Sequence, residues 1–310
     1  MIGLRRRRAR SSAAGRRAPA RAAELALLLL AGAPVNGIAQ DAGHPEGVPQ
    51  PTPAYTIDAV RYASIPGFRT AGLVMGADPA ERTDIAMVFW VIRGAGRVVL
   101  FDSGFHRERW FSTFDVTDYL RPDSALTGLG VAATEVTDVI VSHAHWDHMG
   151  GIELFPEATV HIQREEYEYY TGAAWREGGR RGGIDEDDVV ALVRRNLAGR
   201  VRLVEGDDVE VLPGIRAYTG ARHTYASQYI LVEGAEPFVL ASDNGYLYRN
   251  FETRTAGATF LPTDRSGNEA ALERMLRLAG SSDRVVPGHD ALQFARFPSR
   301  GRVARIRAPG

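Results

Sequence analysis

The residues best suited to chemistry lie close together in 142-SHAHWDHMGG-151. Three of the eight histidines in this 310-residue chain, His143, His145 and His148, fall within six positions, and Asp147 lies among them. Imidazole nitrogens and carboxylate oxygens are common ligands of zinc and related divalent metals. Because this one segment offers more ligands than a single ion needs from it, the cluster indicates two adjacent cations, each bound by a pair.

Three residues further along the chain stand in comparable positions. His223, Asp243 and His289 each lie at the carboxyl end of a short apolar run that predicts a strand. Such positions favour binding sites, because a rigid sheet holds the adjoining loop in place. Since the chain contains no cysteine, any metal must be held by imidazole, carboxylate or solvent. We interpret the remaining histidines as structural or surface residues: His44, His106 and His161.

The segments expected to position these residues include two groups of predicted strands. The first group comprises 55–63, 84–94, 97–104, 137–143 and 159–163, and the second comprises 201–206, 208–214, 215–220, 228–234, 237–243 and 284–288. Helical periodicity appears at 164–172, 185–199 and 268–280. Asp185 is expected to cap its helix, and Gly199 and Gly280 fit helix ends. Two sheets packed face to face, with the helices outside, would bury these strands.

The amino-terminal segment differs from the rest of the chain. Residues 1–39 combine an arginine-rich start, the apolar run 25-LALLLLAGA-33 and small residues at the end, the order of a secretory signal peptide cut after about Ala39. The apolar run is shorter than the roughly 20 residues that a spanning helix needs, so we expect a periplasmic or secreted protein. Residues 40–54 are predicted to form an irregular lead-in, and residues 55–310 a single domain.

The composition limits the classes of partner. Hydrophobic residues make up 45% of the chain, enough for a sizeable core, and the net charge of −1 gives no reason to expect nucleic acid. Cleavage after residue 39 would remove eight arginines and one glutamate. The mature protein would then be acidic, without stable membrane association. The arginine pairs are compatible with the general or the twin-arginine export route.

The first cluster carries a family resemblance. His-Ala-His-Trp-Asp-His at 143–148 resembles the HxHxDH signature of the metallo-β-lactamase superfamily, and Asp102 in 101-FDSG-104 resembles the early Asp-Ser/Thr-Gly turn that supports the site. Positions that match the later motifs follow in order: His223, Asp243 and His289. The resemblance extends from about Tyr55 to Phe297. It implies an α/β protein with the αββα four-layer sandwich, in which two mixed sheets are flanked by helices.

The resemblance also implies a set of metal ligands. His143, His145 and His223 would bind one ion, Asp147, His148 and His289 would bind the other, and Asp243 would bridge them. Two Zn²⁺ per chain are the first expectation, although such sites also accept iron, manganese or cobalt. A metal pair provides a water-derived nucleophile near neutral pH and polarises a carbonyl group. Asp147 would orient that nucleophile.

Local features favour one branch of this superfamily. The bridging Asp243 and the lack of cysteine argue against a β-lactamase. Tyr246 stands three residues after Asp243, as does the tyrosine with which N-acyl homoserine lactonases hold the substrate carbonyl and the leaving alkoxide. Tyr248 is the competing candidate for this role, and the alternative interpretation of Tyr246 is an ordinary aromatic at a sheet edge.

Aromatic residues near the cluster suggest how an acyl chain would be held. Trp146, together with Tyr225 and 166-EYEYY-170, would line an apolar lip. The alternative is that the tyrosines of 166–170 only cover a solvated helix. The long segment between His148 and His223 contains the glycine- and arginine-rich stretch 177-EGGRRGGID-185, which we expect to shape the pocket.

The sequence therefore predicts an exported dinuclear zinc hydrolase that opens a lactone ring, with N-acyl homoserine lactone as the first candidate and Asp147 and Tyr246 as catalytic residues. The alternatives on the same site are a β-lactamase or a glyoxalase II-like thioesterase. A mononuclear iron persulfide dioxygenase and a metal-stabilised binding protein are the rivals from other classes. The predicted partner is a small-molecule lactone, and the sequence also allows a homodimer.

Overall fold

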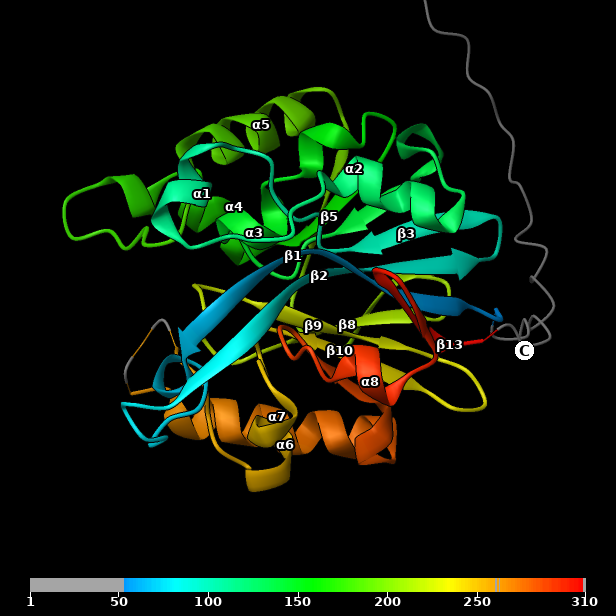
Figure 1. Cartoon of the computed structure of the whole chain (residues 1–310). Coiled ribbons are helices and arrows are strands. Elements are labelled where there is room, and N and C mark those ends of the chain that lie inside the picture. The colour runs from blue at the N-terminus through cyan, green and yellow to red at the C-terminus, as the bar shows by residue number, and fades with distance from the viewer. Residues whose placement is uncertain (1–52, 260, 262, 309–310) are drawn as a thin grey trace, which may run out of the picture. The chain divides into compact units, whose positions relative to one another are not determined.

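The computed structural model describes residues 53–259, 261 and 263–308, and two stacked β-sheets form its centre (Figure 1). The predicted signal peptide and residues 40–52 of the predicted lead-in lie outside the described residues. The strands are β1 Thr56–Arg69, β2 Arg82–Gly94, β3 Arg97–Phe101, β4 Asp138–Ile140, β5 Thr159–Gln163, β6 Val201–Val204, β7 Val209–Leu212, β8 Ile215–Thr219, β9 Gln228–Val232, β10 Phe238–Ser242, β11 Val285–Pro287, β12 Ser299–Arg300 and β13 Val303–Arg307.

Both sheets are mixed. The larger sheet has the strand order β12-β13-β1-β2-β3-β4-β5-β6, with β3 to β6 parallel, and the smaller has the order β11-β10-β9-β8-β7, with β10 and β11 parallel. The prediction that grouped 201–206 with the later strands was wrong, because β6 pairs in parallel with β5. The carboxyl-terminal strands β12 and β13 were not predicted, although β13 pairs with β1.

Alternating side chains explain why the larger sheet needs cover on both faces. Along β2, Met87 and Phe89 pack into the core beneath the helices, whereas Val88 and Trp90 pack into the core between the sheets. Successive residues of a strand point to opposite faces, so a strand that is apolar on both faces must lie in the interior. The larger sheet is therefore an inner layer of the domain.

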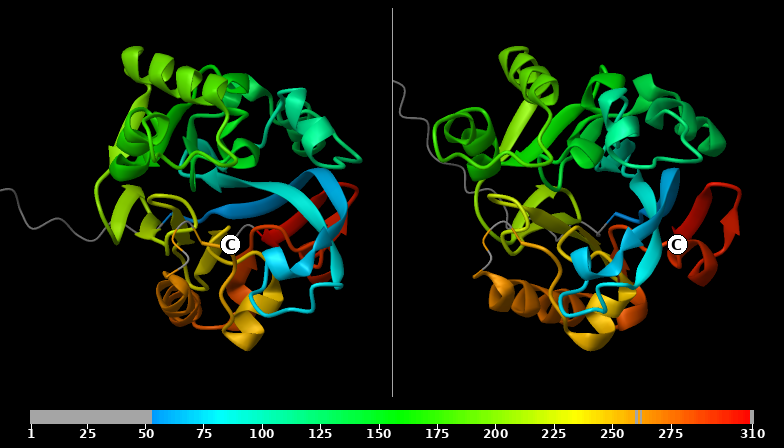
Figure 2. Two further views of the ribbon diagram at one scale, coloured as in Figure 1. Left: turned by 90° about the vertical axis from the view of Figure 1, so that its left-hand side faces the viewer. Right: turned by 60° about the vertical axis from the view of Figure 1, so that its left-hand side comes forward.

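Helices cover the outer face of each sheet. They are α1 Arg109–Thr113, α2 Pro122–Ala125, α3 Trp146–Met149, α4 Arg164–Tyr170, α5 Glu186–Leu197, α6 Tyr248–Thr253, α7 Arg265–Ala279 and α8 Gln293–Arg296. Short 3₁₀ turns connect some of them: Thr70–Gly72, Leu126–Leu129, Ala133–Glu135, Ile152–Leu154, Ala173–Trp175 and Ser282–Arg284. Figure 2 shows α5 on one outer side and α7 on the other. This arrangement confirms the predicted αββα four-layer sandwich of the α/β class.

The three predicted helices form close to their expected bounds. The Asp185 side chain accepts a hydrogen bond from the Asp187 amide at the start of α5. Gly199 and Gly280 both adopt positive φ just after their helices, which confirms their role as helix ends. Among the described residues, no helix has the length and apolar character that crossing a bilayer would require.

Two tight turns at strand ends prepare the site. Asp102 follows β3 with φ of 64°, and Ser242 ends β10 with φ of 47°. Residues other than glycine rarely adopt positive φ, and when they do they often lie at functional turns. Because both turns lie at the carboxyl ends of their strands, their side chains can meet at the same edge of the sandwich.

Candidate metal centre

The structure brings all seven predicted ligand residues together at one edge of the sandwich. Strand β4 ends at Ile140, and the chain then passes through His143 and His145 into the single-turn helix α3, which carries Asp147 and His148. The other three ligand residues arrive on separate segments: His223 between β8 and β9, Asp243 after β10, and His289 after β11.

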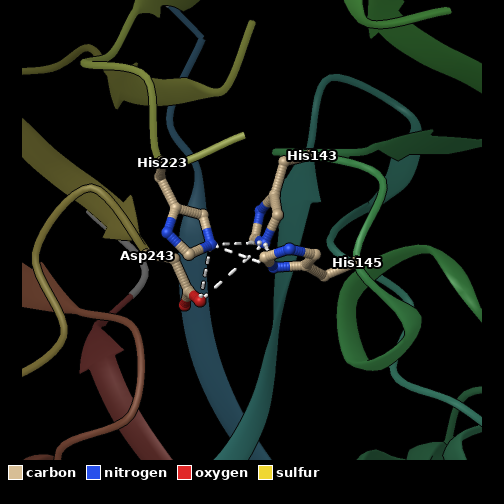
Figure 3. Close-up of side chains that lie close together, drawn as sticks. All are labelled: His143, His145, His223 and Asp243. Atoms are coloured by element: carbon tan, nitrogen blue, oxygen red, sulfur yellow. Dashed lines mark hydrogen bonds and ion pairs between the residues drawn. The ribbon is translucent and has the colours of Figure 1, made fainter. Parts of the chain in front are cut away.

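The first set of ligand atoms comes from His143, His145, His223 and Asp243 (Figure 3). His143 Nε2, His145 Nδ1 and His223 Nε2 lie 3.0 to 3.1 Å from one another. Asp243 Oδ2 lies 3.2 Å from His223 Nε2 and 3.8 Å from His143 Nε2. Ligands about 2.0–2.1 Å from a tetrahedral zinc would be about 3.3 Å apart, so these spacings suit a zinc ion.

The second set lies on the other side of Asp243 and consists of Asp147, His148 and His289. Asp243 Oδ1 is 3.0 Å from His289 Nε2 and 3.3 Å from His148 Nε2. Asp147 Oδ2 is 3.3 Å from His148 Nε2. Asp243 thus directs one carboxylate oxygen to each set, which is the geometry of a bridging ligand.

Hydrogen bonds on the far side of each ring fix its orientation. His148 Nδ1 lies 2.8 Å from Asp102 Oδ2, His143 Nδ1 lies 2.8 Å from Ser142 Oγ, and His289 Nδ1 lies 2.9 Å from the Ala86 carbonyl oxygen. Such partners hold the proton on one ring nitrogen and leave the other as a metal ligand. In each of these rings the nitrogen left over is Nε2, the one that faces the cluster.

Two buried atoms of the cluster indicate that protein contacts alone do not complete it. Within the described part of the chain, neither His148 Nε2 nor Asp243 Oδ1 has a hydrogen-bond partner, although both are shielded from solvent. An unsatisfied buried polar atom is costly. Since a neutral imidazole nitrogen and a carboxylate oxygen are both ligands for divalent metals, the residues fit a metal at this position.

The electrostatics of the cluster suit cations. Burial, followed by the nearby His148, lowers the pKa of His143 well below its usual value, and burial and His223 lower the pKa of His145 to about 3. Burial also acts to lower the pKa of His148, but the carboxylates around it, Asp147 first, raise that pKa well above its usual value. A metal cation would replace the proton there, because metal ligation requires the neutral ring.

A cavity of ≈ 360 Å³ opens directly over the cluster. Its apolar wall comes largely from the β1–β2 hairpin and neighbouring segments: Ile65, Phe68, Leu73, Ile85, Met87 and Phe114. Asp147, Asp243 and Tyr246 contribute polar atoms to the lining. None of the described residues that line this cavity is an arginine, although the chain contains 37 cationic residues. The site therefore combines a metal-binding floor with apolar, uncharged walls.

Of the three predicted substrate contacts, two line the cavity and one does not. Trp146 lines the cavity and stacks on Trp110 with ring centroids 4.7 Å apart. Tyr246 also lines it, and its hydroxyl lies 3.0 Å from His223 Nδ1. Tyr225 is not among the described residues that line it, and its ring stacks on Tyr169 instead, with centroids 4.1 Å apart.

Two further predictions concerned Tyr248 and the loop 177–185, and only the loop reaches the cavity. Tyr248 is not among the described residues that line the cavity. The guanidinium carbon of Arg296 lies over its ring, 3.7 Å from the ring centroid. The loop 177–185 does reach the cavity, through Gly182 and Gly183. Gly183 has φ of 74°, and a Cβ there would lie 2.9 Å from the His145 ring, so only glycine lets the loop approach this ligand so closely.

Some functional residues were missed at the sequence level. Ser242 Oγ donates to Asp102 Oδ2 and lies 2.9 Å from Ser142 Oγ, so both serines support the His148 and His143 rings. Ser242 directly precedes Asp243, which was the available signal. Ile65 and Met87 in the cavity wall gave no signal, because their alternation with other apolar residues is that of any buried strand.

The histidines set aside as structural have ordinary partners. His161 Nε2 lies 2.8 Å from Asp138 Oδ1 within the larger sheet. His106 Nδ1 lies 2.8 Å from the Gly150 carbonyl oxygen, just beyond α3. His44 lies outside the described residues. Neither His106 nor His161 belongs to a ligand set found among the described residues.

The sequence profile of the metallo-beta-lactamase superfamily matches residues 87–289, a span that contains every ligand residue above. An N-acyl homoserine lactonase from a Bacillus species is 29% identical over 234 residues, which cover 69% of this chain and 85% of that protein. The N-acyl homoserine lactonase AttM of Rhizobium johnstonii is 32% identical over 176 residues, covering 54% of this chain and 64% of the relative.

Solved structures show the same fold at lower identity. A mutant of AiiA from B. thuringiensis with N-decanoyl-L-homoserine at its active site superposes with a TM-score of 0.64, at 20% identity, over 79% of this chain and 97% of that one. AidC, described as a dizinc quorum-quenching lactonase in complex with a product, gives a TM-score of 0.57 at 15% identity, over 76% of this chain and 88% of that one.

Proposed function

This chain belongs to the metallo-β-lactamase superfamily and, with lactonases among its relatives, is a metal-dependent hydrolase, and we propose that it uses two zinc ions to open the ring of a neutral lactone. An N-acyl homoserine lactone is the proposed substrate, and its degradation would quench quorum sensing. The observation that carries the proposal is the division of the Asp243 carboxylate between two ligand sets beneath an apolar cavity.

The ligand sets define where the metals would bind. His143, His145 and His223 would hold one ion, Asp147, His148 and His289 the other, and Asp243 both. When bound, such a pair supplies a water-derived nucleophile at neutral pH and polarises the substrate carbonyl. A mononuclear iron dioxygenase would use fewer ligands, so the complete second set favours the hydrolase.

The cavity wall distinguishes among substrates of this superfamily. β-Lactams and glutathione thioesters carry carboxylates, and a site that binds them benefits from a cationic side chain. The described lining residues provide none, and instead offer Phe68, Leu73 and Met87. An uncharged lactone with an apolar acyl chain matches this wall better, because burial of the chain is favourable at about 25 cal/mol per Å² of apolar surface.

Tyr246 is placed to stabilise charge that develops on the substrate. Burial, and then the Asp243 carboxylate, raises the pKa of Tyr246 well above its usual value, so its hydroxyl keeps its proton. If His223 Nδ1 carries hydrogen, the tyrosine oxygen accepts it at 3.0 Å. The hydroxyl hydrogen is then available for the carbonyl oxygen or the departing alkoxide of a substrate in the cavity.

Asp147 is the carboxylate suited to proton transfer. Burial raises its pKa, but His148 and His289 outweigh that effect and hold the pKa below its usual value, so the group is a base at neutral pH. Ring opening adds hydroxide to the acyl carbon, breaks the bond to the ring oxygen and places a proton on that oxygen. Asp147 lines the cavity and would accept the proton of the attacking water and pass it on.

The proposal is tested by metal analysis and a substrate panel on the purified protein. We expect about two zinc ions per chain, and hydrolysis of acyl homoserine lactones at least about tenfold faster in kcat/KM than that of a carbapenem or a hydroxyacyl glutathione thioester. About one iron per chain with oxygen consumption would instead identify a dioxygenase. Preference for the carbapenem or the thioester would contradict the lactonase assignment.

We also propose export, on the order of cationic, apolar and small residues within 1–39. Expression of the full chain in a Gram-negative host should give periplasmic protein whose first residue lies near Gln40. Recovery of the intact chain from the cytosol alone would contradict this localisation.

A further inference from the structure

A buried carboxylate outside both ligand sets lies behind the metal centre. Glu166 belongs to the first turn of α4 and is 0% exposed. Its Oε1 accepts hydrogen bonds from the Ala144 amide at 2.8 Å and from Thr224 Oγ1 at 2.7 Å, and its Oε2 accepts one from the Ala226 amide at 2.6 Å. A single side chain thereby satisfies three donors.

These donors belong to two different ligand loops. Ala144 lies between His143 and His145 on the loop that follows β4 in the larger sheet. Thr224 and Ala226 lie just after His223, on the loop between β8 and β9 of the smaller sheet. Figure 3 shows the two loops approaching the cluster from opposite sides. Glu166 therefore connects the loops that supply every imidazole of the first ligand set.

A backbone hydrogen bond also links the same two loops. The Gln228 amide donates to the Ser142 carbonyl oxygen at 2.8 Å, where β9 begins. This bond joins the start of the loop after β4 to the end of the loop between β8 and β9. Glu166 contacts a neighbour of a ligand residue on each loop, Ala144 between His143 and His145 and Thr224 next to His223, so these contacts act on the spacing of the ligand atoms.

The charge of Glu166 is costly to bury. Burial raises the pKa of its carboxyl group, and the bonds from Thr224, Ala144 and Ala226 offset only part of that rise. A carboxylate accepts at both oxygens, whereas glutamine would present an NH₂ group to one of the three donors. The requirement for two accepting oxygens explains a glutamate at this position, since a buried donor left without an acceptor is destabilising.

We propose that Glu166 is a positioning residue that sets the separation between the His143/His145 loop and the His223 loop and so determines the metal affinity of the first ligand set. The inference rests on the proposed metal-binding function. The effect should fall on one of the two ions, because the residues that donate to Glu166 flank His143, His145 and His223, and none of them flanks Asp147, His148 or His289. Loss of the clamp would leave the second ion's ligands in place.

The test is a chelator competition titration of Zn²⁺ with the full chain, which resolves two dissociation constants in the wild type. Glu166→Gln should weaken one constant by about 10–100-fold, as outer partners of metal ligands do, and leave the other within about twofold. In ¹¹³Cd-loaded protein, one of two resonances should shift or disappear. Added zinc should restore much of the lost lactonase activity.

Two further variants keep the test decisive if Glu166→Gln folds poorly. Thr224→Val removes one of the three donors with little change in shape, and should weaken the same constant about tenfold or less. Asp58→Asn is the matched control, because Asp58 is also a fully buried carboxylate but pairs with Arg93 and Arg305. It should lower stability and leave both zinc constants unchanged.

The outcomes separate this inference from the proposed function. If the wild type binds two zinc ions and Glu166→Gln retains both constants, the positioning role is wrong and the dinuclear site stands. If Glu166→Gln weakens both constants equally, as a general loss of stability would, the role is also wrong. A wild type that binds no zinc overturns both proposals.

Discussion

Two buried aspartate–histidine pairs lie at different ends of the parallel strands of the larger sheet. Asp102 follows the last residue of β3 and contacts His148 Nδ1 at 2.8 Å. Asp138 is the first residue of β4 and contacts His161 Nε2, on β5, also at 2.8 Å. All four residues are buried. The contact itself does not distinguish a site that does chemistry from one that stabilises the sheet.

The difference lies in what the remaining atoms of each pair meet. Arg97 donates to the second oxygen of Asp138 at 2.9 Å, so its charge is balanced by protein. His148 Nε2, in contrast, has no hydrogen-bond partner among the described residues and faces Asp147 and Asp243 at 3.3 Å. A buried imidazole nitrogen directed at carboxylates alone indicates a cation that the protein does not supply.

The strongest test of this difference removes each histidine. His148→Ala should lower kcat/KM by on the order of 10³-fold or more, because metal ions stabilise transition-state charge by several kcal/mol. It should also reduce bound metal. His161→Ala should keep kcat/KM within about twofold and lower only the free energy of unfolding, by about 1–3 kcal/mol. Equal kinetic losses in the two variants would remove the distinction between the pairs.

A milder test changes the two aspartates. Asp102→Asn should reduce metal affinity or turnover by about 10–100-fold, because it disturbs the partner of a metal-binding histidine. Asp138→Asn should leave both quantities unchanged. Zinc titration and steady-state kinetics on the same preparations measure this. An unaltered Asp102→Asn enzyme would show that the His148 ring does not depend on its partner.

A further test concerns the His223 ring, whose partner is the neutral hydroxyl group of Tyr246 instead of a carboxylate. Tyr246→Phe removes the hydroxyl near His223 and should lower kcat by about tenfold, the value of one hydrogen bond to developing charge, with both metals retained. Tyr248→Phe is the control, since Tyr248 packs under Arg296 away from the cavity. A similar loss of kcat in both variants would argue against the role of Tyr246.

The smallest expected effect is a pH dependence confined to the structural pair. Burial raises the pKa of Asp138, but hydrogen bonds from His161 and Thr137 and the charge of Arg97 hold it below its usual value of 3.8. The lowered pKa means that this carboxylate stabilises the fold above its unfolded pKa and ceases to do so as pH falls through the folded value.

The free energy of unfolding of the wild type should therefore exceed that of Asp138→Asn by about 1 kcal/mol or more near pH 7. This difference should shrink as the pH falls below 3.8 and through the lower pKa of the folded state. Urea unfolding of both proteins at several pH values measures it, and the contribution of the metal centre cancels in the difference. If the difference instead grew at acid pH, the ionised Asp138 carboxylate would not stabilise the fold, and this prediction would be wrong.

The candidate ligand residues could be recognised from sequence because four of them gather in one segment and the other three each follow a short apolar run. That pattern placed His223, Asp243 and His289 at strand ends, and the sheets then brought them to the HAHWDH segment. The order of helices and strands indicated two sheets with helices outside, and the family resemblance implied the four-layer sandwich. Local pattern carried these predictions, because strand ends are local features.

Contacts between segments that are distant in the sequence could not be predicted from it. The assignment of β6 to the larger sheet depends on its neighbour β5 and not on its own residues. Ile65 and Met87 have the alternation of ordinary core strands, and only the packing of the hairpin places them in the cavity wall. Glu166 stands in a tyrosine- and glutamate-rich helix that resembles a solvated one, and its burial became evident only from the two loops that it connects.

The central claim is that Asp243 joins two complete ligand sets into one dinuclear centre. Metal analysis of the wild type and of Asp243→Ala, purified side by side, tests it most directly. We expect about two zinc ions per chain in the wild type. In Asp243→Ala we expect both the amount of bound metal and the rate of lactone hydrolysis to fall. An active wild type with a single metal ion, or an Asp243→Ala protein that retains two ions and full activity, would contradict the claim.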